Sequence, residues 1–159
     1  MYILSFLSKT DVEAFHVRKP TNIVRQGLHQ RIYFGTVVFA YGNGYNRRTG
    51  RFTAPYDGIY YFFTQITTNH SDNTSIWVNL VRDTSRVTDY YRGKVKIIRT
   101  RMFPYNDFGA KQIRGNLQAL VYLKARAEMY VEVLGNSWTR QNVVLNRYTH
   151  FSGCLLSRM

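Results

Sequence analysis

The chain has 159 residues, of which 45% are hydrophobic, so it is long enough for one buried core and too short for two. It carries 22 Lys and Arg against 9 Asp and Glu, a net charge of +13, which should attract phosphates, sulfates and carboxylates. The single cysteine, Cys154, excludes an internal disulfide framework. No apolar run approaches the roughly 20 residues that a membrane helix needs, so we expect no membrane insertion.

The dominant pattern along the chain is an alternation of apolar and polar residues, interrupted at short intervals by Gly, Asn, Asp and Pro. Such a pattern predicts antiparallel strands, with turns at Asn43–Gly44, Thr49–Gly50 and Asp57–Gly58. Eight to ten strands in one domain of this size indicate a sandwich or jelly roll. In chain order, the clearest strands are expected at residues 14–17, 31–39, 59–68, 76–81, 94–102, 116–123, 129–134 and 150–156.

One segment is ambiguous between helix and strand. Residues 117–132 contain several good helix formers, among them Leu117, Ala119 and Leu120. The alternation around Val121 and Tyr130 nevertheless favours two strands joined by a turn.

The strand at residues 59–66 is apolar on both faces. Tyr61, Phe63 and Gln65 share one face, and the other face carries Tyr60, Phe62, Thr64 and Ile66. A strand of a β-sandwich with one solvent-exposed face should alternate between apolar and polar residues. The second face should therefore be covered, and oligomerisation is the simplest way to cover it.

The aromatic and glycine residues between positions 34 and 62 follow a recognisable spacing: Phe34, Tyr45, Phe52, Gly58, Tyr60 and Phe62. With Ala14–Val17 at the start and Phe151–Leu156 at the end, this order resembles the signature of the complement C1q globular-domain family over residues 13–157. The resemblance implies an all-β, ten-stranded jelly-roll β-sandwich of the C1q and tumour necrosis factor type. It also implies an N-terminal extension at residues 1–12 and a globular domain at residues 13–159.

The resemblance further implies a secreted, extracellular homotrimer that serves in recognition and not in catalysis. Tyr61, Phe63 and Gln65 would lie at the trimer interface. No Gly-X-Y run is present, so the chain is similar to the stalkless, soluble members found in invertebrate innate immunity.

Two basic clusters are candidate ligand-binding sites. The first is the segment with Arg92, Lys94, Lys96, Arg99 and Arg101, where alternating cations could follow a polyanion along a strand. The alternative is a solvated edge strand that charge protects from aggregation. The second is Arg47, Arg48 and Arg51, in a turn region that could also be solubilising decoration.

Trp138 and Arg140 form a third candidate, because the indole could stack on a sugar beside a cation. The alternative is a tryptophan that anchors its own loop.

The sequence offers no catalytic set and no phosphate-cradling glycine loop, so we expect no enzyme. Calcium is the one cofactor to consider, and the net charge of +13 on the chain argues against a bound cation. The loop acids available to such a site are Asp57, Asp72, Asp83, Asp89 and Asp107.

We therefore expect a trimeric, lectin-like pattern recogniser that binds anionic glycans or lipopolysaccharide on microbial surfaces, with avidity from three weak patches. Two alternatives stay open: a trimerising module of a matrix, adhesive or mineral-associated protein, and a cytokine-like receptor ligand. Nucleic acid ranks last, because no groove-reading motif accompanies the charge.

Overall fold

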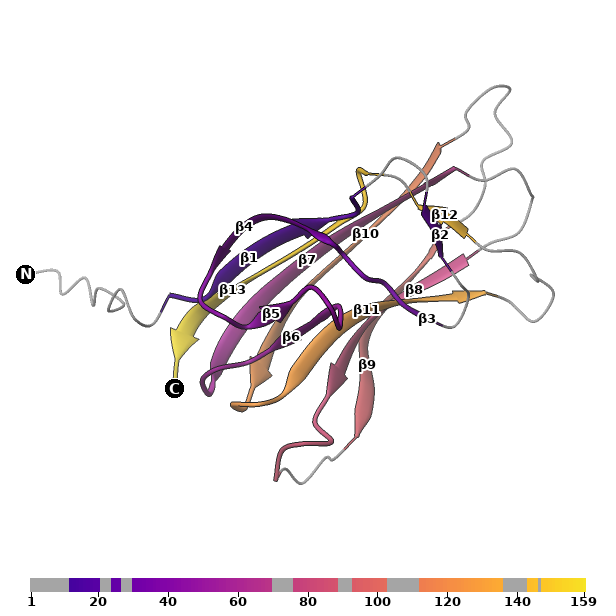
Figure 1. Cartoon of the computed structure of the whole chain (residues 1–159). Coiled ribbons are helices and arrows are strands. Elements are labelled where there is room, and N and C mark those ends of the chain that lie inside the picture. Colours follow the sequence, from indigo (N-terminus) through magenta and orange to yellow (C-terminus); the bar gives the residue numbers. More distant parts are fainter. Residues whose placement is uncertain are drawn as a thin grey trace, which may run out of the picture.

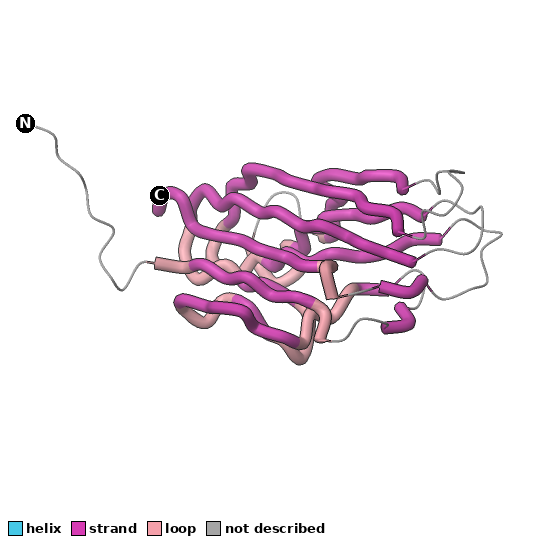
Figure 2. The backbone as a smooth tube through the Cα atoms, turned by 90° about the horizontal axis from the view of Figure 1, so that it is seen from above, coloured by secondary structure: helices cyan, strands magenta, loops and turns pink. Residues whose placement is uncertain are grey.

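The computed structural model describes residues 12–20, 24–26, 30–69, 76–88, 93–102, 112–135, 143–145 and 147–159. These residues form two antiparallel β-sheets packed face to face, and the sheets are joined by loops and turns (Figures 1 and 2). The described residues include no helix that could cross a membrane. The two-sheet, all-β architecture confirms the predicted jelly-roll class.

The larger sheet has the strand order β2–β12–β7–β13–β1–β4, and β10 pairs with the other edge of β7. The longest pairing joins β7 and β10 over their whole lengths, with Tyr61 opposite Leu120. Its strands are β1 (Ala14–Arg18), β2 (Val24–Gln26), β4 (Thr36–Tyr41), β7 (Gly58–Asn69), β10 (Gln112–Leu123), β12 (Val143–Leu145) and β13 (His150–Arg158).

The smaller sheet has the order β5–β6–β11–β8–β9, and β3 pairs with β11. Strand β9 is therefore an edge strand that pairs with β8 alone within the described part of the chain. Its strands are β3 (Gln30–Arg31), β5 (Tyr45–Asn46), β6 (Arg51–Thr53), β8 (Ile76–Asp83), β9 (Lys94–Met102) and β11 (Glu128–Gly135).

The core between the sheets is built around aromatic rings from both sheets. The ring of Phe15 stacks on Tyr45 at 5.0 Å and on Phe52 at 5.2 Å between centroids. Phe62 stacks on Phe151 at 5.9 Å, and both side chains are fully buried. These residues come from five strands, three in the larger sheet and two in the smaller one, so they hold the two layers together.

The single strand expected at residues 31–39 is wrong. The structure divides it into β3, which pairs with β11 in the smaller sheet, and β4, which pairs with β1 in the larger one. Residues 32–35 cross from one sheet to the other, and Ile32 donates a backbone hydrogen bond to Val131 at 2.8 Å on the way. Ile32 and Phe34 are both buried within this crossing segment. The alternation of buried and exposed residues therefore continues where the strand itself is interrupted.

The ambiguous segment at residues 117–132 forms two strands joined by a turn, as predicted. The two strands do not pair with each other: β10 lies in the larger sheet and β11 in the smaller one. At the turn between them, Arg126 has a positive φ of 74°. The backbone N–H of Ala125 donates to Asp57 Oδ1 at 2.7 Å, which fixes the turn to the start of β7.

Candidate functional site

Four cations of β9 lie on one exposed face of the smaller sheet, and we call them the basic stripe. Their partners on β8 are the odd-numbered residues from Trp77 to Asp83. The even-numbered residues Ile76, Val78 and Leu80 are buried in the core, so the odd-numbered residues lie on the face of the sheet turned away from the core. The stripe consists of Lys94, Lys96, Arg99 and Arg101, all of which are exposed.

A β-bulge produces this alignment. The register of β9 against β8 shifts between Leu80 and Val81, so that Ile97 is the extra residue. Without the bulge, strict alternation would turn Arg99 and Arg101 to the face opposite Lys94 and Lys96. Ile97 packs against the core, which keeps the irregularity in place.

Behind the stripe, Arg99 is held by two neighbours that the sequence did not single out. Its Nε donates to Asn79 Oδ1 at 2.7 Å, and Asn79 Nδ2 donates in turn to Glu132 Oε1 at 2.8 Å. The guanidinium carbon lies 5.0 Å from the ring centroid of Trp77, and that of Arg101 lies 5.2 Å from the same ring. Only the pairing of β8 with β9 and β11 brings these residues together.

The predicted cation Arg51 is engaged in ion pairs. Its Nη1 contacts Asp83 Oδ2 at 3.1 Å and also Glu128 Oε2, and both acidic side chains are buried. The guanidinium carbon also lies 4.8 Å from the ring centroid of Tyr130. Arg51 therefore compensates two buried charges on the outward face of the smaller sheet, unlike the exposed cations of the stripe.

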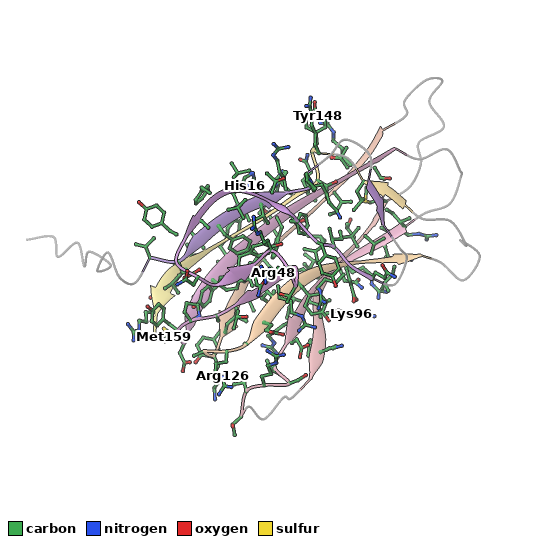
Figure 3. The ribbon with its side chains drawn as sticks, viewed as in Figure 1. His16, Arg48, Lys96, Arg126, Tyr148 and Met159 are labelled. Carbon is green, nitrogen blue, oxygen red and sulfur yellow. The ribbon has the colours of Figure 1, made fainter. Side chains whose placement is uncertain are left out.

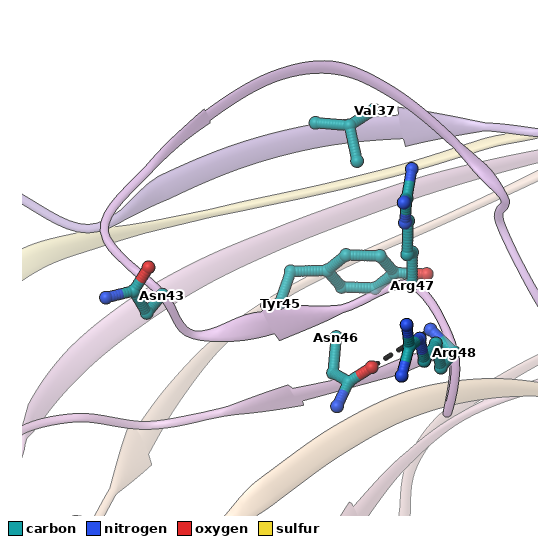
Figure 4. Close-up of a pocket in the computed structure, with 6 residues that line it drawn as sticks. All are labelled: Val37, Asn43, Tyr45, Asn46, Arg47 and Arg48. Carbon is teal, nitrogen blue, oxygen red and sulfur yellow. Dashed lines mark hydrogen bonds between the residues drawn. The ribbon is translucent and has the colours of Figure 1, made fainter.

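Arg47 and Arg48 lie in the exposed turn between β5 and β6 (Figure 4). Asn46 organises this turn: its Oδ1 accepts the Arg48 N–H at 2.9 Å and its carbonyl accepts the Gly50 N–H at 2.8 Å. Gly50 has a φ of 67°, which favours glycine. The turn borders a shallow hollow with Val37 and Tyr45. Because β5 and β9 are opposite edges of the sheet, the structure does not join this cluster to the basic stripe.

Several predicted site residues lie outside the described residues: Arg92, Trp138 and Arg140 of the ligand candidates, and Asp72, Asp89 and Asp107 of the loop acids. The two acids that are described already have partners, since Asp57 accepts the Ala125 N–H and Asp83 pairs with Arg51. Across the described ranges, no group of three or more His, Cys, Asp and Glu side chains could hold a metal ion.

The expected interface residues Tyr61, Phe63 and Gln65 lie on the outward face of the larger sheet and are half-buried. Around them is an unusually apolar surface, which we call the association face. Leu120 is 66% exposed and Phe39 is 50% exposed. By strand pairing, this face includes Ala14, His16, Phe39, Tyr41, Ile59, Tyr61, Phe63, Gln65, Gln118, Leu120, Tyr122, His150, Ser152 and Cys154.

A histidine pair at the centre of the association face was not predicted from the sequence. His16 on β1 and His150 on β13 have ring centroids 5.1 Å apart, and His16 Nδ1 lies 2.6 Å from Ser152 Oγ. Burial lowers the pKa of both imidazoles, and the charge of Arg18 lowers that of His16 further. Figure 3 labels His16 on this side of the sandwich and Lys96 on the other.

The outward faces of the two sheets differ in charge. Strands β1, β4, β7, β10 and β13 contain no Asp or Glu, and their three cations are Arg18, Arg114 and Arg158. The smaller sheet carries acids of its own, but these are paired with Arg51 or Asn79. The sandwich thus presents an apolar face and, opposite to it, a face edged with cations.

Two of the solved structures that share this architecture illustrate the likeness. The globular domain of zebrafish complement 1qA protein matches with a TM-score of 0.63 and 19% identity, over 92% of this chain and 98% of that one. The Eiger TNF of S. frugiperda matches with a TM-score of 0.68 and 15% identity, over 93% of each chain. At these identities the likeness establishes the fold.

The family follows from the sequence, by the match of a family model. The family model described as the C1q domain matches residues 14–156, from the first strand of the larger sheet to its last. This range contains the aromatic core, the association face and the basic stripe. The chain belongs to the C1q domain family.

Proposed function

We propose that this chain is a secreted, non-enzymatic recognition module that trimerises through its association face and binds anionic glycans or lipopolysaccharide on microbial surfaces through its basic stripe. Three stripes on one rigid assembly would act together, so that weak single contacts gain strength by avidity. Membership of the C1q domain family supports the recognition role. The observation that carries the ligand class is the alignment of four exposed cations by the bulge in β9.

Exposed apolar area supports self-association. Soluble monomers seldom expose extensive apolar surface, whereas Phe39 is 50% exposed and Leu120 is 66% exposed on this face. Phe39, Tyr61 and Leu120 come from three different strands of one paired sheet, so the strand pairing holds the surface in place. Light scattering should give three times the monomer mass, and a stable monomer would contradict the proposal.

Charge supports the choice of ligand. Within the described residues, Lys94, Lys96 and Arg99 take part in no ion pair, so these three cations of the stripe keep their charge for a ligand. On the same sheet face, Asp83 and Glu128 are paired with Arg51, and Glu132 accepts a hydrogen bond from Asn79. A linear anion along β9 would therefore meet the cations of the stripe before these engaged carboxylates.

The test is surface plasmon resonance on immobilised lipopolysaccharide and acidic glycans across a salt series. The wild type should bind at low salt and weaken steeply as salt rises, because the contacts are exposed charges. A variant that neutralises the stripe (Lys94→Gln, Lys96→Gln, Arg99→Gln, Arg101→Gln) should lose this binding. Arg47→Gln with Arg48→Gln is the matched control and should keep it.

Two results would contradict the ligand assignment: no binding at low salt, or equal losses in both variants. A saturable protein receptor on cells would instead indicate the cytokine-like alternative. Localisation to shell, mucus or another matrix would favour the structural one.

A further inference from the structure

We infer that Arg99 is the specificity-determining residue of the basic stripe, and that it recognises the oxyanion groups of a linear acidic polysaccharide. The inference rests on the proposed function, because it names the ligand class and the anchor residue of the same surface. Charge alone would make the four cations of the stripe equivalent. The structure distinguishes Arg99 from the two lysines by the hydrogen bond and the aromatic ring that hold it.

The first support for Arg99 comes from inside the sheet. Its Nε donates to Asn79 Oδ1 at 2.7 Å, and Asn79 is fully buried. Asn79 is itself oriented by the bond from its Nδ2 to Glu132 Oε1 at 2.8 Å. A charged donor fixed by a buried, oriented acceptor has one preferred rotamer, in contrast to an exposed lysine.

The second support is the Trp77 ring. The guanidinium carbons of Arg99 and Arg101 lie 5.0 Å and 5.2 Å from its centroid, which is the range of cation–π contact. This contact restrains the plane of the guanidinium, while the bond to Asn79 fixes its direction. A receptor group that is ordered before binding loses less conformational entropy when the ligand arrives.

The two Nη atoms of the Arg99 guanidinium are the part available to a ligand. The Nη atoms of Arg99 make no hydrogen bond within the described part of the chain, and the residue is exposed. A planar fork of two N–H donors matches a carboxylate or sulfate in bidentate fashion, which the ammonium of Lys94 or Lys96 cannot do. Arg99 can therefore discriminate by geometry where the lysines contribute only charge.

The same contacts argue against recognition by stacking. Binding of single-stranded nucleic acid depends on aromatic rings that are open to bases. Trp77 is the one aromatic residue of β8 or β9, and two guanidinium groups already lie over it. The stripe extends over roughly 20 Å of strand, which suits a chain of several sugar units with repeated anionic groups.

The experiment compares Arg99→Lys, which keeps the charge and removes the fork, with Lys96→Gln, which removes one charge and keeps the fork. The probes are heparin for sulfate, polygalacturonate for carboxylate, and single-stranded DNA as the stacking ligand. Arg99→Lys should weaken binding to heparin or polygalacturonate by about tenfold, and Lys96→Gln by only about two- to threefold. Whichever polysaccharide the wild type binds more tightly identifies the oxyanion.

Thermal melting by circular dichroism should show both variants folded. The inference is overturned if Arg99→Lys binds like the wild type, or if DNA binds as tightly as the polysaccharides. In either case the loss of binding on neutralising the whole stripe would still stand, so the proposed function would survive. Absence of binding by the wild type to any polyanion would contradict both.

Discussion

The imidazole rings of His16 and His150 lie 5.1 Å apart on the association face, with an angle of 47° between their planes. The ring centroid of Phe63 lies 5.5 Å from that of His150, and the ring centroid of Phe39 lies 6.4 Å from that of His16. Among the described residues, the buried Nδ1 of His150 has no hydrogen-bond partner. The fold thus holds two partly buried imidazoles against each other, beside the rings of Phe39 and Phe63.

This pair predicts that stability falls as the solution becomes acidic. Burial lowers the pKa of both histidines in the folded state, and the charges of Arg18 and of the neighbouring histidine add to the effect. The unfolded chain, with ordinary histidine pKa values of about 6.5, therefore binds more protons below that pH. The stabilising contribution is complete above about pH 6.5 and is lost as the pH falls toward the folded pKa values.

Urea unfolding between pH 8 and pH 5 measures this dependence of stability on pH. Tyr61, Gln65 and Ser152 on the neighbouring strands include no carboxylate that could reverse the sign of the dependence. The variant His16→Gln with His150→Gln should show a flatter dependence on pH. A wild type whose unfolding free energy is the same at pH 5.5 and pH 7.5 would contradict the assignment.

Arg51 should matter more for folding than its exposed position in the sequence pattern indicates. The side chains of Asp83 and Glu128 are only 6% and 7% exposed, and Arg51 contacts both. Replacing Arg51 with Met leaves two buried carboxylates poorly compensated, so the free energy of unfolding should fall by about 3 kcal/mol.

Arg86 offers a matched control for Arg51. Its Nη1 lies 3.4 Å from Glu128 Oε1, but its side chain is 74% exposed. Arg86→Met should therefore cost less than about 1 kcal/mol in the same urea titration. Equal effects of the two substitutions would show that the burial of the acids does not decide the strength of the pair.

Alternation along the chain was sufficient to predict the sandwich and the bounds of β9, because one face of each strand must pack on the core. It was insufficient at residues 32–35, where the chain changes sheets. Ile32 and Phe34 remain buried there, so the local pattern of a strand survives although its partner changes. A change of partner is a tertiary event that local periodicity does not record.

The candidate site depended even more on non-local pairing. The sequence indicated a basic segment, but strict alternation separates Arg99 and Arg101 from the two lysines. The bulge that reunites them is defined only by the register of β9 against β8. Likewise, His16 and His150 are distant in sequence, and they become neighbours because β1 pairs with β13.

The aromatic core should be sensitive to the loss of a single ring. Phe62 is fully buried and lies 5.4 Å from Phe52 and 5.9 Å from Phe151 between centroids. Phe62→Ala removes contacts to both sheets and leaves a cavity, so unfolding should become easier by about 3–5 kcal/mol. Tyr33→Ala, at a residue that is 44% exposed, should change the unfolding free energy by less than about 1 kcal/mol. Urea denaturation of both variants measures the contrast, and comparable losses would contradict the position of the core.

The single thiol reports on whether the association face is covered in solution. Cys154 is half-buried on that face, opposite Tyr61, and burial raises its pKa. Leu120→Arg places a charge at the most exposed leucine of the face and should convert the assembly to monomers. The thiol of the Leu120→Arg variant should then react with a disulfide-exchange reagent several times faster than the thiol of the wild type.

Light scattering on the same samples gives the subunit number, and Thr88→Arg, at an exposed loop residue, is the control that should leave both readouts unchanged. Faster labelling together with a lower mass ties the thiol to the interface, because a folded monomer differs from the assembly at this face and not at Thr88. Equal masses and equal labelling rates for Leu120→Arg and the wild type would mean that copies of the chain do not meet through β7, β10 and β13.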